Sequence, residues 1–201
     1  MTPKLPRHGR GMRIGLFGGS FNPPHAGHRH ASLLAMRRLG LDRVWWLVTP
    51  GNPLKHNAAL PPLDQRMAAA RAVARHPRID VTGLEEAIGT PFTHETIAYL
   101  KRRCPGVHFV WIMGADGLAG FHRWKRWRDI ALLAPIAVID RPGATFSASH
   151  SRAGARLARF RAPEADARGL AVAAPPALVF LHGPRSALSS TSLRAKAAFK
   201  D

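Results

Sequence analysis

Residues 18–28 read GGSFNPPHAGH and connect a strand-like segment to a helix-like one. A short apolar run at 14–17 precedes it, and residues 27–39 after it carry small and apolar side chains at helical spacing before Gly40. A strand, a glycine turn and the start of a helix therefore follow one another. This order is typical of the first unit of a parallel sheet whose strands are joined by helices.

The rest of the chain repeats that alternation of strand-like and helix-like segments. Strands are predicted at 14–17, 44–48, 79–82, 107–113, 136–139 and 178–181, and helices at 27–39, 63–75, 96–103 and 192–199. Strands separated by helix-length segments indicate an α/β, Rossmann-like parallel sheet with helices on both faces. We expect a single domain over 13–201, preceded by a flexible basic extension at 1–12.

Length and cysteine content exclude several classes of protein. The chain has 201 residues and one cysteine, Cys104, which rules out an internal disulfide framework and any zinc module with several cysteines. The basic start shows no secretory signal, and prolines interrupt the apolar runs at 130–139 and 170–181. These features predict a cytoplasmic protein that does not cross a membrane.

The net charge of +18, from 30 Lys+Arg against 12 Asp+Glu, predicts an affinity for anions. Many arginines fall in the Arg/Ala/Pro-rich stretch 152–168, for which a solvated surface is the favoured interpretation. A nucleic-acid-binding protein is the alternative, but no recognition motif supports it as the main role.

Residues 18–28 also predict an anion site. Ligands of such sheets bind beyond the carboxyl ends of the strands. There the glycines let backbone N–H groups approach a phosphate, and the following helix points its positive end at the same place. His25 and His28, three residues apart, lie on one face of the first turn and can both donate hydrogen bonds. A zinc site including His30, or histidines that merely cap the helix, are the weaker alternatives.

Residues 189–194, SSTSLR, offer a second set of phosphate donors. Hydroxyls that open a helix, with Arg194 one turn inside, suit an oxyanion. Taken alone, the segment would be an ordinary helix cap. A histidine site in the same sheet favours the phosphate interpretation.

Several segments together resemble a known family. Residues 19–28 match the G-x-F-x-P-x-H-x-G-H signature of the nucleotidyltransferase superfamily, and residues 189–194 resemble its S-S-T-x-[IL]-R element. The segments WWLVTPGNPLK (45–55), GAD (114–116), FHRWKRW (121–127) and RPG (141–143) are similar to the bacterial nicotinate-nucleotide adenylyltransferases. Pantetheine-phosphate adenylyltransferases and cytidylyltransferases share the histidine motif but do not account for FHRWKRW.

The resemblance implies transfer of AMP from ATP to nicotinate mononucleotide, giving deamido-NAD and pyrophosphate by direct attack of the substrate phosphate. It implies Mg²⁺ held mainly by the ATP phosphates, with no metal ligands from protein side chains. The residues carried over by position are His25 and His28 for catalysis; Gly18, Gly19, Ser20, Phe21, Lys55, Ser190, Thr191 and Arg194 for the ATP phosphates; Gly114 and Asp116 at the adenosine end; and Thr93 and Trp124 for the nicotinate nucleotide.

The sequence departs from the family pattern at four positions. Ser20 and Asn22 replace the commoner Thr and Asp, and Phe92 stands where Tyr often precedes Thr93. His56 follows Lys55 where the usual order is His-Lys. Packing is the favoured interpretation for Trp45, Trp46 and Trp127. Whether the protein is a monomer or a homo-oligomer is left open.

Overall fold

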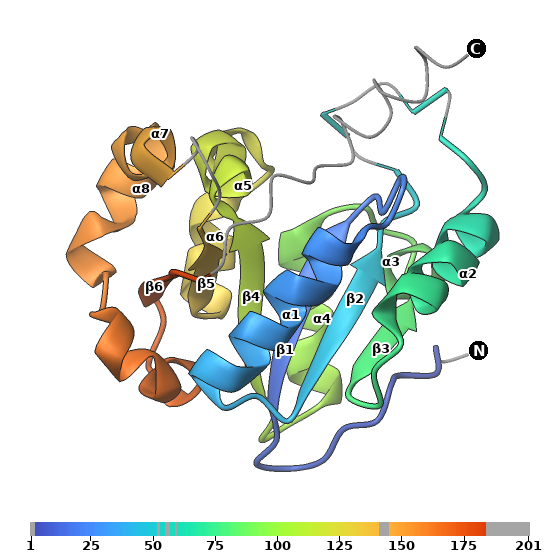
Figure 1. The fold of residues 1–201 in the computed structure, drawn as a ribbon, viewed down its shortest axis with the longest axis horizontal. Helices are drawn as coiled ribbons and strands as arrows, with labels where there is room; N and C mark the ends of the chain where they lie inside the picture. Colours follow the sequence, from blue (N-terminus) through green and yellow to red (C-terminus); the bar gives the residue numbers. More distant parts are fainter. Residues whose placement is uncertain (1–2, 52, 55–56, 59, 141–144, 184–201) are drawn as a thin grey trace.

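A six-stranded parallel sheet, in the order β3-β2-β1-β4-β5-β6, forms the centre of the molecule (Figure 1). The computed structural model describes residues 3–51, 53–54, 57–58, 60–140 and 145–183. The strands are β1 (Arg13–Gly19), β2 (Arg43–Val48), β3 (Ile79–Thr82), β4 (His108–Gly114), β5 (Ile136–Ile139) and β6 (Leu178–Leu181). The predicted α/β Rossmann-like class is confirmed.

The inner residues of β2, β4, β5 and β6 are apolar and buried because both faces of the sheet are covered, whereas the edge strand β3 includes Asp80 and Thr82. In β4, Phe109, Trp111 and Met113 belong to one hydrophobic core, and the alternate residues Val110 and Ile112 belong to the other. Successive side chains of a strand point to opposite faces, so a continuous apolar run fills two cores at once.

Helices cover both faces of the sheet. The helices α1 (Ala26–Leu39), α2 (Leu63–Ala74) and η3 (Glu164–Val172) pack on one face. The other face carries α3 (Leu84–Ala87), α4 (Thr93–Arg103), α5 (Ala115–Gly120), η1 (Phe121–Arg123), α6 (Trp127–Leu133), α7 (Thr145–His150), α8 (Arg152–Leu157) and η2 (Ala158–Phe160). Figure 1 shows α1 in front of the sheet and α4 behind it. None of the helices among the described residues is long and apolar enough to span a membrane.

All six predicted strands are confirmed: β3, β5 and β6 match their predicted bounds, and the ends of β1, β2 and β4 shift by at most two residues. The predicted helices 27–39 and 63–75 correspond to α1 and α2, and 96–103 corresponds to α4, which begins three residues earlier at Thr93. The prediction of a helix at 192–199 lies outside the described residues. The short helices between 115 and 172 were not predicted, because segments of three to nine residues are too short to show a clear helical period.

The segment before β1 lies against the sheet. Leu5 packs on the core that contains Trp45, and the ring of His8 meets the edge of that indole at 6.1 Å between centroids. The backbone N–H of Gly11 donates to the carbonyl of Gly106 at 2.7 Å. The flexibility expected for residues 1–12 stays a prediction.

Surface arginines dominate the basic 152–168 stretch, as expected. Its five arginines are exposed, whereas Ala153, Gly154 and Leu157 are buried. Trp45 and Trp46 are fully buried and Trp127 packs against the core, so the packing interpretations of these tryptophans are confirmed. Cys104 is buried at the end of α4.

Candidate active site

A cavity of about 430 Å³ opens at the carboxyl ends of β1 and β4. These two strands are neighbours, but the chain fills β2 and β3 on one side of β1 before it crosses to β4 on the other. Such a switch point leaves a crevice between the loops that follow the two strands, and ligands of open α/β sheets bind there.

The cavity, called the cleft below, collects most of the residues that the sequence singled out. Its lining includes Gly18 and Gly19 at the end of β1; Ser20, Phe21, His25 and His28 after β1; Thr93 at the start of α4; Gly114 at the end of β4; Asp116 in α5; and Trp124 after η1. Lys55, Ser190, Thr191 and Arg194 lie outside the described residues. The structure brings the others into one space, while their roles toward ligands stay predictions.

His25 and His28 lie at the N-terminus of α1, as its N-cap residue and in its first turn. His25 is the residue before the helix, with an extended backbone at φ −150°, and only 6% of it is exposed. Its backbone N–H donates to Nδ1 of His28 at 3.2 Å, and the two rings lie 3.9 Å apart between centroids. Because Nδ1 of His28 accepts this bond, a neutral His28 carries its proton on Nε2, which makes Nε2 a hydrogen-bond donor.

Aromatic rings pack against the histidine pair. Phe21 lies 4.8 Å from the ring of His28 and stacks on Trp46 at 4.9 Å with an interplanar angle of 18°. The indole N–H of Trp46 donates to the hydroxyl of Ser32 in α1 at 2.7 Å. Sheet, loop and helix are therefore packed around the two imidazoles, which restricts their orientation.

Packing against the neighbouring strand requires a glycine at Gly18. A Cβ atom at this position would lie 2.5 Å from Cη2 of Trp111, in the neighbouring strand β4. At Gly19, the nearest atom to such a Cβ would be a Phe21 ring carbon at 3.5 Å, an ordinary contact. The two glycines thus differ in how strictly they are needed.

The start of α4 and Trp124 also line the cleft. The indole of Trp124 meets Trp111 edge-on at 6.1 Å and Phe121 at 5.3 Å, both between ring centroids. Thr93 is the first residue of α4, a helix of 11 residues. The positive end of this helix therefore faces the same cavity as a flat aromatic ring.

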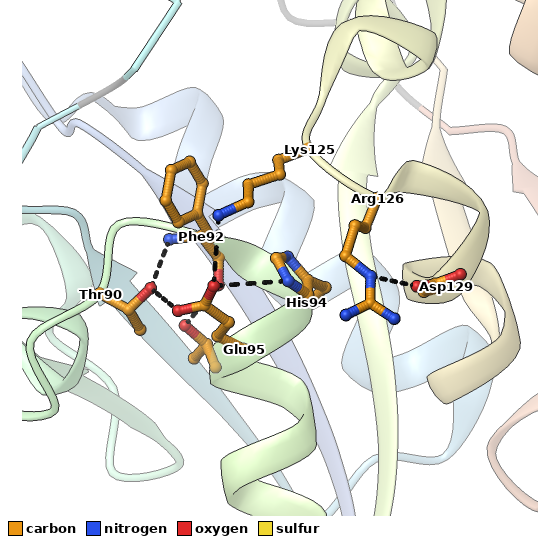
Figure 2. Close-up of polar contacts among 8 residues, drawn as sticks. Thr90, Phe92, His94, Glu95, Lys125, Arg126 and Asp129 are labelled. Atoms are coloured by element: carbon orange, nitrogen blue, oxygen red, sulfur yellow. Dashed lines mark hydrogen bonds and ion pairs between the residues drawn. The ribbon is translucent and has the colours of Figure 1, made fainter.

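A polar cluster links α4 to the segment that carries Trp124 (Figure 2). Nζ of Lys125 lies 3.6 Å from the Glu95 carboxylate and 3.9 Å from the centroid of the Phe92 ring. The hydroxyl of Thr90 donates to Glu95 at 2.6 Å, and this bond lowers the pKa of Glu95. The neighbouring His94 is buried, and burial lowers the pKa of its ring.

Glu85 is a cleft residue that sequence reasoning missed. It lies in α3, is 4% exposed, and accepts a hydrogen bond from Thr96 at 3.3 Å. Burial raises its pKa to about 7, and contacts with Thr49 and Thr96 oppose that shift. The sequence held no signal for it, because EE at 85–86 also suits an exposed helix.

Comparisons with known proteins agree with this geometry. The cytidylyltransferase-like family model matches residues 16–196. Two relatives, from Methylorubrum extorquens and Rhizobium johnstonii, carry the name "Probable nicotinate-nucleotide adenylyltransferase". The first is 62% identical over 92% of this chain and 100% of its own length, and the second is 52% identical over 98% and 99%. The chain belongs to the nicotinate-nucleotide adenylyltransferases.

Solved structures support the fold assignment of this family member. The Plasmodium falciparum nicotinic acid mononucleotide adenylyltransferase complexed with NaAD aligns with a TM-score of 0.66 and 16% identity, over 92% of this chain and 83% of that chain. At this identity the likeness concerns the fold.

Proposed function

We propose that the protein transfers AMP from ATP to nicotinate mononucleotide, releasing pyrophosphate and forming deamido-NAD. The observation that carries this proposal is the single cleft, which joins a histidine pair at one helix start with an indole and a second helix start. The names of the relatives, at 52–62% identity over nearly the whole chain, support the same reaction.

The chemistry needs no nucleophile from the protein. A phosphate oxygen of the mononucleotide attacks the α-phosphorus of ATP, and the bond to the pyrophosphate oxygen breaks in line with it. Catalysis then consists of aligning two anions and stabilising the charge that shifts to the leaving group. Imidazole donors at His25 and His28 and the N-terminal N–H groups of α1 suit this task.

Mg²⁺ would enter this site on the ATP phosphates. The carboxylates that line the cleft are Glu85 and Asp116, and the described residues hold no group of three His, Cys, Asp or Glu that could bind a metal ion. Because Mg²⁺ keeps several waters and readily takes phosphate oxygens, the donors present fit a metal carried by the nucleotide. When bound, the ion would neutralise part of the triphosphate charge.

The start of α4 suits the nicotinate carboxylate. Its first N–H groups and its helix dipole favour a negative charge, and Trp124 can stack on the pyridine ring. Glu95 in the first turn would oppose this, but the ammonium of Lys125, which also lines the cleft, lies 3.6 Å away and offsets its charge. An amide would turn an NH₂ group toward a helix N–H, a mismatch of about 1–3 kcal/mol when buried.

The test compares substrates. Purified protein should form dinucleotide from ATP with nicotinate mononucleotide at least about tenfold more efficiently than with nicotinamide mononucleotide, since tenfold corresponds to about 1.4 kcal/mol. Two control reactions test the related enzyme classes: CTP replaces ATP in one, and phosphopantetheine replaces the mononucleotide in the other. A preference for either of these alternatives would assign the protein to another branch of the superfamily.

The variant Trp124→Ala tests the pocket assignment. It should weaken binding of nicotinate mononucleotide while ATP binding is preserved, as measured by calorimetry on each ligand. A defect confined to ATP would show that Trp124 does not cover the pyridine ring. Inversion of configuration at the α-phosphorus, with a chiral ATP analogue, checks direct transfer, because a covalent enzyme intermediate would give retention.

A further inference from the structure

Arg66 is a buried cation next to the cleft that the proposed mechanism does not use. It lies in α2 and only 3% of it is exposed. Burial lowers the pKa of its guanidinium, although an arginine stays charged at neutral pH. Keeping such a charge out of water is costly, so the contacts of its donors indicate what it is for.

Within the described residues, the hydrogen-bond acceptors of Arg66 are backbone carbonyls. Nη1 donates to the carbonyls of Ser20 at 2.9 Å and Thr49 at 2.8 Å. Nη2 donates to Pro50 at 3.4 Å, and Nε donates to Pro61 at 2.8 Å. The guanidinium thus joins the loop after β1 to the loop after β2.

These bonds determine which way two peptide groups face. In a trans peptide the C=O and N–H bonds point in opposite directions, and the peptides 20–21 and 50–51 are trans. With the carbonyls of Ser20 and Pro50 turned to Arg66, the N–H groups of Phe21 and Gly51 point away from it. Both Phe21 and Gly51 line the cleft.

The backbone at Phe21 needs such a restraint. Phe21 has φ +47°, in the left-handed region that residues other than glycine rarely adopt. A conformation of this kind persists where surrounding contacts hold it. The stacking on Trp46 holds the ring, and the bond from Arg66 to the Ser20 carbonyl holds the preceding peptide.

We propose that Arg66 is a positioning residue for ATP: it turns the peptide groups 20–21 and 50–51 so that their N–H donors face the phosphates. This inference rests on the proposed function, in which the loop after β1 holds the triphosphate. The alternative is a guanidinium that only anchors α2 to the sheet. The two roles differ in one respect: anchoring affects stability and both substrates alike, whereas positioning affects ATP selectively.

The experiment compares Arg66→Lys with Arg43→Lys. Lysine keeps the charge of Arg66, but its ammonium has three N–H donors on a single atom, so it cannot replace the four bonds that Nε, Nη1 and Nη2 make at separate positions. Arg43 is the matched control, because it also ties strands together through Asp80 and the Pro77 carbonyl, at the amino end of β2 away from the cleft. Calorimetry measures the affinities for ATP and for nicotinate mononucleotide, and thermal unfolding measures stability.

We expect Arg66→Lys to lower ATP affinity about tenfold or more, with mononucleotide affinity within about twofold of wild type. In kinetics at saturating mononucleotide, KM for ATP should rise more than kcat falls. Arg43→Lys should lower the unfolding midpoint without changing the ratio of the two affinities. Arg66→Met, which removes every donor at similar length, should exceed the ATP defect of the lysine variant; if it fails to fold, the lysine variant decides.

An equal loss for both ligands, or the same pattern in Arg43→Lys, would overturn the positioning role in favour of anchoring. Unchanged ATP affinity in folded Arg66→Lys would overturn it as well. These outcomes leave the proposed function standing, because wild type still binds ATP. A wild-type protein that binds no ATP would instead refute the proposed function and this inference together.

Discussion

Replacing Gly18 with alanine tests how tightly the sheet is packed beneath the site. The added Cβ would lie 2.5 Å from Cη2 and 3.1 Å from Cζ2 of Trp111, where an ordinary contact is 3.4–4 Å. Either the indole or strand β1 must therefore move by about 1 Å. Trp111 is 1% exposed and touches the edge of Trp124, so it cannot move alone.

Overpacking of this kind costs about 1–3 kcal/mol of unfolding free energy. For a domain of this size, each kcal/mol lowers the melting temperature by roughly 2–4 °C. The assay is thermal and urea unfolding without ligand, so that any effect on binding stays separate. Because Trp111 supports Trp124, we also expect weaker binding of nicotinate mononucleotide, measured by calorimetry.

Gly19→Ala is the matched control one residue away. Its Cβ would meet the Phe21 ring at 3.5 Å, which needs no rearrangement, so stability should stay within about 0.5 kcal/mol of wild type. If both alanine variants unfold at the same temperature, Trp111 adapts freely and the reasoning from close packing is refuted.

Three further outcomes are expected. His25→Ala should fold and lower the rate of adenylyl transfer at least about a hundredfold, since a preorganised donor contributes roughly 2.7–4 kcal/mol; near-normal turnover would contradict its role. Arg194→Ala should weaken ATP more than nicotinate mononucleotide in calorimetry, and an equal loss would count against a phosphate contact. Burial raises the pKa of Glu85 from 4.5 to about 7, so folding favours its protonated form. The free energy of unfolding should therefore fall by up to about 3 kcal/mol as the pH rises from 4.5 to 7. In urea unfolding at several pH values, Glu85→Gln should show a smaller decline of the unfolding free energy than wild type. An unchanged pH dependence would refute the raised pKa of Glu85.

The fold could be predicted because its signals are local. Short apolar runs near Gly or Pro mark most of the strands, such as the run at 107–113 between Gly106 and Gly114, whereas IDVT at 79–82 is a weaker signal. Parallel pairing then follows from the helix-length segments between them. The start of α4 was missed because its N-cap residue, Phe92, has no polar side chain that would mark a helix start in the sequence.

The part of the site that could be predicted lies directly after strands. His25 and His28 follow β1, Gly114 ends β4 and Asp116 follows it, and parallel strands bring such residues to one edge. Glu85 and Arg66 could not be found in this way. Their importance depends on burial against segments distant in the chain, and an Arg in a helix rich in Ala and Arg is ordinarily exposed.

Helix capping and phosphate binding, weighed as alternatives for the histidines, prove compatible in geometry. His28 accepts a hydrogen bond from the His25 backbone through Nδ1, as a capping side chain does. That same bond places the proton of the neutral ring on Nε2, the atom on the far side of the imidazole. The capping contact therefore prepares the ring as a donor, and His28→Asn should preserve part of the cap while losing a donor at the Nε2 position. A larger loss in ATP affinity than in stability for this variant would separate the two roles.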